Sequence, residues 1–138
     1  MTSTVVYNGA LRTTCTHLKS GNSFETDAPV DNNGKGERFS PTDLMATSLG
    51  TCMLTVMGIK ARSMGFDLDG MHVSVLKTML ADPRRVGAID LGFQIPAHLI
   101  SLDEKSKSIL KHTADTCPVI RSLHPDLKVT VDWGGWRE

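Results

Sequence analysis

Cysteine is the residue type in this sequence with the clearest capacity for covalent chemistry, because a thiolate is a strong nucleophile that oxidises reversibly. The 138-residue chain contains three cysteines, Cys15, Cys52 and Cys117. Cys117 directly precedes Pro118, and proline is favoured as the first residue of a helix. Cys117 would then be the N-cap residue, where free backbone N–H groups and the helix dipole stabilise a thiolate. The alternative interpretation is a cap residue in a turn, without chemistry.

Cys52 lies in an uncharged segment that covers residues 44–59. It can be a small buried hydrophobic residue, because free cysteine is among the most buried residue types and apolar burial raises the pKa of a thiol. Cys15 stands two residues before His17, which is not a zinc spacing, so we interpret it as structural. The five histidines are scattered outside any metal-binding motif. We therefore expect neither a metal ion nor an organic cofactor.

Three charged residues lie within or beside the expected elements that carry the cysteines. Asp43 follows Ser40 by three residues, a spacing typical of a capping box at the start of a helix, with Pro41 as the first helical residue. Arg12 lies on an expected strand, and the sequence around it indicates a solvated charge at the edge of a sheet. Arg38, just before the helix, is interpreted in the same way.

The helix that carries Cys52 is the clearest element in the sequence. It is expected to run from Pro41 to about Met64, a length of roughly 36 Å, and to end at Gly65. Because residues 44–59 bear no charge on any face, the helix is expected to be buried all round. One small subunit has little else to cover it, which favours a homodimer.

The remaining elements alternate strands and helices around this long helix. Residues 27–38 are expected to form a loop. β-Branched and aromatic residues predict strands at Thr4–Tyr7 and Leu11–Leu18, and the turn signal at Ser20–Asn22 allows a third at Ser23–Thr26. Alternation of side chains predicts three more strands, Met71–Leu80, Val86–Ile95 and Leu127–Trp133. Ser101 and Glu104 resemble a second capping box, so a helix is expected from Leu102 to about Thr116, followed by a short one over Pro118–Leu123. The sequence thus predicts an α+β fold with a largely antiparallel sheet, in one domain over residues 1–138.

Composition excludes several classes of function. Fifteen Lys and Arg balance fifteen Asp and Glu, and aromatic residues make up 5%. A neutral chain with few aromatic residues lacks the charge and the stacking surface that nucleic acids or an anionic membrane require. The N-terminus has no signal-peptide pattern, and the uncharged run is shorter than a membrane span, so a cytoplasmic protein with reduced thiols is expected.

Two segments resemble the OsmC/Ohr family. Phe39–Leu44 followed by Leu49–Cys52 is similar to the helix that bears the first cysteine of that family, in which Cys52 stands eleven positions after Pro41. Cys117-Pro118-Val119, followed by Arg121–Leu123, is similar to the family's second cysteine motif. The resemblance extends over nearly the whole chain and implies an intertwined homodimer with a long buried central helix.

The resemblance also implies a function, a thiol-dependent peroxidase that reduces organic hydroperoxides. Cys52 would be the peroxidatic cysteine and Cys117 the resolving one, with an external thiol as reductant. Arg12 stands where the family has an arginine that supports the first cysteine. The family's glutamate position is occupied by Thr42, which leaves Asp43 and Glu37 as candidate supporting carboxylates and indicates an OsmC-like side branch.

The alternative is a non-enzymatic dimer of the same fold, either redox-responsive or binding a small apolar ligand. Thr42 in place of the glutamate and the expected burial of Cys52 favour this alternative. Repeated turnover of a hydroperoxide distinguishes the two hypotheses, because a sensor or a binder would be oxidised once.

Overall fold

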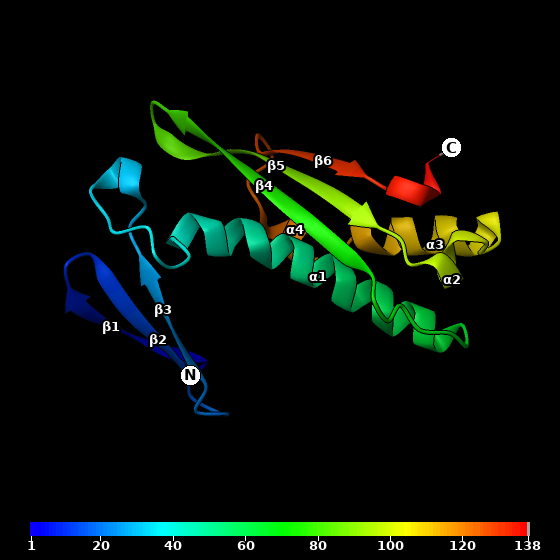
Figure 1. The fold of residues 1–138 in the computed structure, drawn as a ribbon, viewed down its shortest axis with the longest axis horizontal. Helices are drawn as coiled ribbons and strands as arrows, with labels where there is room; N and C mark the ends of the chain where they lie inside the picture. Colours follow the sequence, from blue (N-terminus) through cyan, green and yellow to red (C-terminus); the bar gives the residue numbers. More distant parts are fainter. Residues whose placement is uncertain (138) are drawn as a thin grey trace. The chain divides into compact units, whose positions relative to one another are not determined.

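The computed structural model describes residues 1–137, which form two compact units (Figure 1). The first unit covers Met1–Met45, and the second begins at Ala46. The single domain expected over residues 1–138 stays a prediction.

The first unit is built on a three-stranded antiparallel sheet of order β1-β2-β3. Its strands are β1 (Ser3–Gly9), β2 (Arg12–His17) and β3 (Ser23–Asp27). Strand β3 is one residue longer than the sequence predicted, which places Asp27 in the sheet. A 3-10 helix, η1 (Val30–Asn32), forms within the segment that was expected to be a loop.

Helix α1 (Pro41–Ser63) begins where the capping pattern predicted. The Ser40 backbone N–H donates to Asp43 Oδ2 at 2.9 Å, and the Asp43 N–H donates to Ser40 Oγ at 3.0 Å, so the capping box is reciprocal. At the other end Gly65 adopts a left-handed φ of 90°, and the Phe66 N–H donates to the Ala61 carbonyl. The helix is therefore about 35 Å long, as expected.

Burial of α1 is confined to one side within this chain. The buried residues recur at intervals of one to four positions: Ala46, Leu49, Gly50, Met53, Met57 and Ala61. Thr51 and Thr55 are exposed, and the Ile59 side chain is 67% exposed. The expectation of burial on every side is thus not met by this chain alone. Among the described residues α1 is also the one helix long and apolar enough to cross a membrane, a criterion that core helices of water-soluble proteins meet equally.

The second unit contains a three-stranded sheet of order β4-β5-β6. Strands β4 (His72–Ala81) and β5 (Arg84–Gln94) form the predicted antiparallel hairpin, whereas β6 (Lys128–Asp132) runs parallel to β5. This sheet is therefore mixed and not purely antiparallel. The chain between β5 and β6 contains three helices, and such a long connection is what a parallel pair requires.

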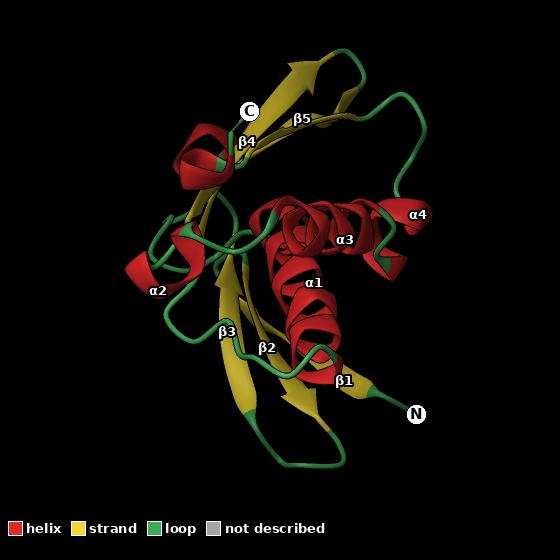
Figure 2. Ribbon diagram, turned by 90° about the vertical axis from the view of Figure 1, so that its right-hand side faces the viewer, coloured by secondary structure: helices red, strands yellow, loops and turns green. Residues whose placement is uncertain are grey.

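Those three helices are α2 (Ala97–Ile100), α3 (Glu104–Asp115) and α4 (Pro118–Ser122). Helix α2 was not predicted. Ser101 is its C-cap residue, so the capping box expected at Ser101 is wrong. Asp103 caps α3 instead, because its Oδ1 accepts the Ser106 N–H at 2.9 Å. Figure 2 shows α3 beside α1 in this unit.

The core of the second unit lies between α1, the inner face of the sheet and α3. Gly50 lets the helix approach the sheet closely, since a Cβ there would lie 3.0 Å from Val75 and 3.2 Å from Val73. Ile89, Leu91 and Phe93 are buried on β5, as their alternation predicted. Cys117 belongs to this core, and Cys52 packs against it.

Candidate active site

Cys52 occupies the middle of α1 and is half-buried. It precedes Met53 of the buried stripe and follows the exposed Thr51. The thiol therefore lies at the border of the core. A small molecule can approach such a position, which full burial would prevent.

Cys117 is the N-cap residue of α4, as the sequence predicted. Its Sγ accepts the backbone N–H of Ile120 at 3.5 Å, and its exposed fraction is 1%. Pro118 is the first residue of the helix. The cap geometry is thus confirmed, and the residue is enclosed in the core.

The thiols of Cys52 and Cys117 interact directly, and both cysteines are free. Burial raises the pKa of Cys117 above its ordinary value, and the hydrogen bond and charge of Cys52 raise it further. The N–H of Ile120 lowers the pKa, but the effect of burial is larger. The expected effect of the helix start on Cys117 is therefore present, but burial outweighs it.

Arg12 forms the centre of a charged network in the first unit. Its Nε donates to Asp27 Oδ1 at 2.7 Å and its Nη2 to Asp27 Oδ2 at 2.9 Å, a bidentate pair. The same Nη2 donates to Glu37 Oε2 at 2.9 Å. The solvated edge charge expected from the sequence alone is thus wrong for Arg12, whose side chain is 20% exposed.

Asp27 is the buried partner that holds this network together. Its exposed fraction is 1%, and its Oδ2 also accepts the backbone N–H of Glu37 at 3.1 Å. The hydrogen bonds from Arg12 lower the pKa of Asp27, while partial desolvation opposes them. The pair in turn raises the pKa of Arg12, which therefore carries a permanent positive charge.

Asp27 was not expected at this site, because the predicted third strand ended at Thr26. The signal was nonetheless present. Arg12 and Asp27 are directly opposite in the register of β2 and β3, and opposite charges facing each other across a strand pair stabilise a sheet. The observed register is counted outward from a loop at residues 18–21, which the His17 N–H closes by donating to the Asn22 carbonyl, and not from the turn that the sequence placed at Ser20–Asn22.

The other predicted residues divide between the two units. Glu37 lies with Arg12 in the first unit, as does Asp43, whose role in the capping box is confirmed. Cys15, also in the first unit, is half-buried on β2 between Val5 and Phe24 of the neighbouring strands. Cys52 and Cys117 lie together in the second unit. Within residues 1–137 no group of three or more His, Cys, Asp or Glu is arranged to hold a metal ion.

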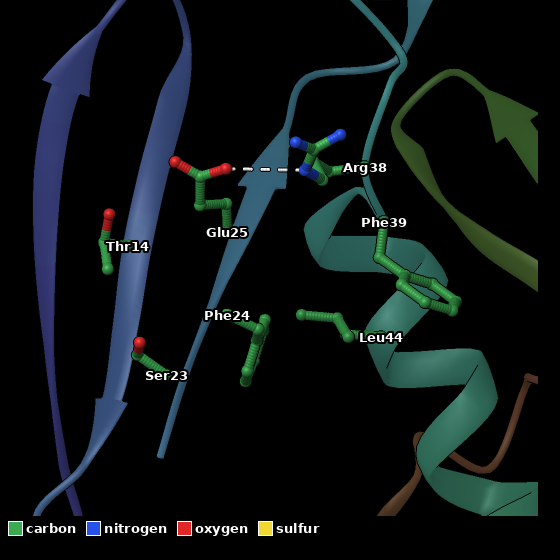
Figure 3. A pocket seen from close by; sticks show the side chains of 7 residues that line it. All are labelled: Thr14, Ser23, Phe24, Glu25, Arg38, Phe39 and Leu44. Carbon is green, nitrogen blue, oxygen red and sulfur yellow. Dashed lines mark ion pairs between the residues drawn. The ribbon is translucent and has the colours of Figure 1, made fainter. Parts of the chain in front are cut away.

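An open pocket of about 630 Å³ lies in the first unit (Figure 3). Phe24, Phe39 and Leu44 provide its apolar surface. Arg38 and Glu25 form an ion pair at its edge, with 3.4 Å between Arg38 Nε and Glu25 Oε2. The solvated charge expected at Arg38 is therefore paired.

Comparisons with known proteins agree on one family. The family model described as OsmC-like protein matches residues 34–132. The chain is similar to a solved protein from Psychrobacter arcticus, provisionally described as an osmotic stress induced and detoxification response protein. The two are 52% identical over 96% of this chain and 95% of the other, with a TM-score of 0.91.

More distant structures share the fold. The organic hydroperoxide resistance protein OsmC of Legionella pneumophila has a TM-score of 0.73 at 15% identity, with 96% of each chain covered. The organic hydroperoxide resistance protein OhrB of Bacillus subtilis has a TM-score of 0.59 at 15% identity, with 96% of this chain and 98% of the other covered. No curated protein matches the chain.

Proposed function

Since this chain belongs to the family of OsmC-like proteins, we propose that it is a thiol-dependent peroxidase that reduces organic hydroperoxides. Cys52 is the peroxidatic cysteine in this proposal, and Cys117 is the resolving cysteine. The family includes proteins described as organic hydroperoxide resistance proteins.

The observation that carries the proposal is the direct contact between the two thiols. They come from α1 and from the start of α4, 65 residues apart in the sequence. A pair of adjacent free thiols, one partly exposed and one buried, fits a cycle in which the exposed thiol meets the substrate first.

The cycle has three balanced steps. The Cys52 thiolate attacks the outer oxygen of the hydroperoxide, the O–O bond breaks, and the alcohol leaves with one proton while Cys52 becomes a sulfenic acid. The Cys117 thiol then attacks the Cys52 sulfur, which forms a disulfide and releases water. Two equivalents of an external thiol restore both cysteines by exchange and leave as a disulfide.

Arg12 supplies the cation in this proposal. Two carboxylates already neutralise it, and they differ in how firmly they are held. Asp27 is buried and binds through both oxygens, whereas Glu37 is 60% exposed and makes one hydrogen bond to Arg12. Glu37 is therefore the partner of Arg12 that is more easily displaced.

A homodimer is part of the proposal, because the chain leaves large apolar side chains uncovered. Ile59 on α1 is 67% exposed, and the sheet of the first unit exposes Val5, Val6 and Tyr7 by 58% to 65%. Exposed apolar area of this kind marks an interface, and each 100 Å² buried contributes about 2.5 kcal/mol before association costs. The occupant that fits best is a second copy of the chain.

Steady-state turnover tests the function. Purified protein with cumene hydroperoxide and dithiothreitol is expected to consume many equivalents of peroxide, and Cys52→Ser is expected to abolish consumption. Cys15→Ser is the matched control and retains activity. If the wild type is oxidised once without turnover, the redox-responsive alternative replaces the enzyme.

A further inference from the structure

Cys117 stands at the junction of helices α3 and α4, and Figure 2 shows α4 at the end of α3. Thr116 is the C-cap residue of α3, and Pro118 is the first residue of α4. Because a residue before proline avoids the α region, Pro118 favours the extended ψ of 153° that Cys117 adopts. The direction of the Cys117 side chain is then decided by the peptide bond on its other side, the one that joins it to Thr116.

This peptide bond is held at both of its polar atoms. The Cys117 N–H donates to the Ala114 carbonyl at 3.1 Å. The Thr116 carbonyl accepts a hydrogen bond from Arg121 Nε, also at 3.1 Å. Because a peptide bond is planar, the two hydrogen bonds fix the plane from which the Cys117 side chain projects. The second bond uses a side chain, so a substitution at Arg121 can remove it.

The group that Arg121 binds is firmly attached to the core of the second unit. Thr116 Oγ1 donates to the His112 carbonyl of α3 at 2.9 Å. Leu110 and Ala114 of the same helix are fully buried. The guanidinium of Arg121 is exposed, but its charge-assisted hydrogen bond ties α4 to a fixed point of α3.

The thiol of Cys117 is held less firmly than its backbone. Its Sγ accepts the Ile120 N–H at 3.5 Å, and sulfur is a weak acceptor. A disulfide requires a distance of about 2.05 Å between the two sulfurs, so the Cys117 sulfur has to leave this cap position to bond with Cys52. The hydrogen bond of Arg121 involves no atom of the thiol and does not have to break in that step.

We propose that Arg121 is a positioning residue for the resolving step of the cycle, a role that rests on the proposed function. Arg121 fixes the peptide plane before Cys117 and so keeps the thiol at a high effective concentration beside Cys52. In the resolving step the Cys117 sulfur bonds to the Cys52 sulfur, the S–O bond of the sulfenic acid breaks, and water leaves with the thiol proton. Arg121 acts through the backbone and is not a catalytic residue.

Equilibration with a glutathione redox buffer measures this positioning without any peroxide. The full chain carries Cys15→Ser, so that Cys52 and Cys117 are its two remaining cysteines. Formation of their disulfide reduces one glutathione disulfide to two glutathione thiols. The equilibrium constant gives the effective concentration of the two thiols, which intact mass measures as the fraction that has lost two hydrogens.

Arg121→Met keeps a long side chain and removes its donors. It is expected to lower the effective concentration by roughly threefold to tenfold. Arg121→Lys is expected to restore part of the loss, because an ammonium group also donates to a carbonyl. Ser122→Ala is the matched control in the same helix, since it removes only the hydrogen bond of Ser122 Oγ to the Pro118 carbonyl, and it is expected to leave the value unchanged.

Single-turnover kinetics with excess cumene hydroperoxide give a second readout. Arg121→Met is expected to leave the rate of Cys52 oxidation unchanged and to slow disulfide formation, so that more Cys52 proceeds to sulfinic acid. A merely structural role of Arg121 would slow both steps equally, and that result would overturn the proposal.

The glutathione equilibrium separates this proposal from the peroxidase itself. A value for Arg121→Met equal to that of the parent, or an equal loss in Ser122→Ala, would overturn the positioning role even if the protein turns over peroxide. If the parent consumes no peroxide, the peroxidase fails, and the equilibrium still decides the role of Arg121. A parent that forms no disulfide in the glutathione buffer would refute both.

Discussion

At the scale of single residues, the two thiols of the candidate site differ in a way that suits different roles. Cys52 is half-buried and meets solvent, whereas Cys117 is enclosed and its pKa is raised by burial. An enclosed thiol with a raised pKa competes less for the peroxide, because the thiolate is the nucleophile. The N–H groups at the start of α4 lower the pKa of Cys117, but burial raises it by more.

Replacement of each cysteine is expected to stop the reaction at a different step. With Cys117→Ser, Cys52 reacts once, persists as a sulfenic acid and proceeds to sulfinic acid under excess peroxide. With Cys52→Ser, no sulfenic acid forms at any position. Intact mass with dimedone trapping checks this, together with a loss of two hydrogens in the oxidised wild type. Undiminished turnover of Cys117→Ser with a thiol reductant would exclude Cys117 as the resolving residue.

Asp27→Asn is expected to lower the melting temperature at pH 7, since the variant leaves Arg12 without its buried partner. The folded pKa of Asp27 is lowered, so its stabilising contribution is present above the unfolded value of about 3.9 and is lost as the pH falls through the folded pKa. The difference between wild type and variant should therefore shrink below about pH 4.

Urea unfolding of both proteins between pH 7 and pH 2 measures this dependence. Glu37→Gln serves as the control, because it removes the exposed partner of Arg12 and should destabilise less. A difference that stays constant with pH would contradict the role of the Asp27 charge.

At the scale of elements, α1 is specified by local signals at its ends and by tertiary contacts along its length. The Ser40–Asp43 capping box starts it and Gly65 ends it. Between these points its two glycines have different surroundings. Gly50 faces the sheet at Val73 and Val75, whereas a Cβ on Gly58 would meet nothing within 4 Å.

Alanine at these two glycines is expected to change stability in opposite directions. Gly58→Ala should stabilise the chain by about 0.5–1 kcal/mol through reduced backbone entropy. Gly50→Ala should destabilise it, because the new methyl group presses on two β-branched side chains with restricted rotamers. Thermal unfolding of the two variants compares them directly. Loss of stability in Gly58→Ala would indicate that a second copy packs against that position.

At the scale of the whole molecule, one chain of 15.0 kDa does not cover its own apolar surface. The side of α1 that includes Thr51, Thr55 and Ile59 remains exposed, although the sequence predicted burial all round. A helix without charge between residues 44 and 59 is stable in water when that side is also covered. Cytoplasmic localisation and the homodimer both remain predictions.

Light scattering is expected to give a mass near 30 kDa, about twice that of the chain. Ile59→Glu should shift the mass toward 15 kDa, because it places a charge on the exposed side of α1. Leu76→Glu is the matched control, since Leu76 on β4 is 63% exposed and lies on the outer face of its sheet. A wild-type mass near 15 kDa at micromolar concentration would refute the dimer.

The sequence by itself determined the features that depend on neighbours along the chain. Hydrogen bonds within a few residues form the helix caps at Ser40 and Cys117, and the helix end at Gly65 is equally local. The alternation of buried residues in β5 follows from the period of a strand. The two cysteine motifs belong to the same class of local signal, and they placed the chain in its family before any contact was known.

Tertiary structure decided what depends on residues far apart in sequence. Three such interactions join segments that lie 15 to 65 residues apart. They are the Arg12–Asp27 pair, the parallel pairing of β6 with β5, and the contact between Cys52 and Cys117. The raised pKa of Cys117 belongs here too, because desolvation is set by every element around a thiol, whereas its helix cap is set by three residues. Local pattern thus located the thiol, and its three-dimensional surroundings decided the direction in which its pKa is shifted.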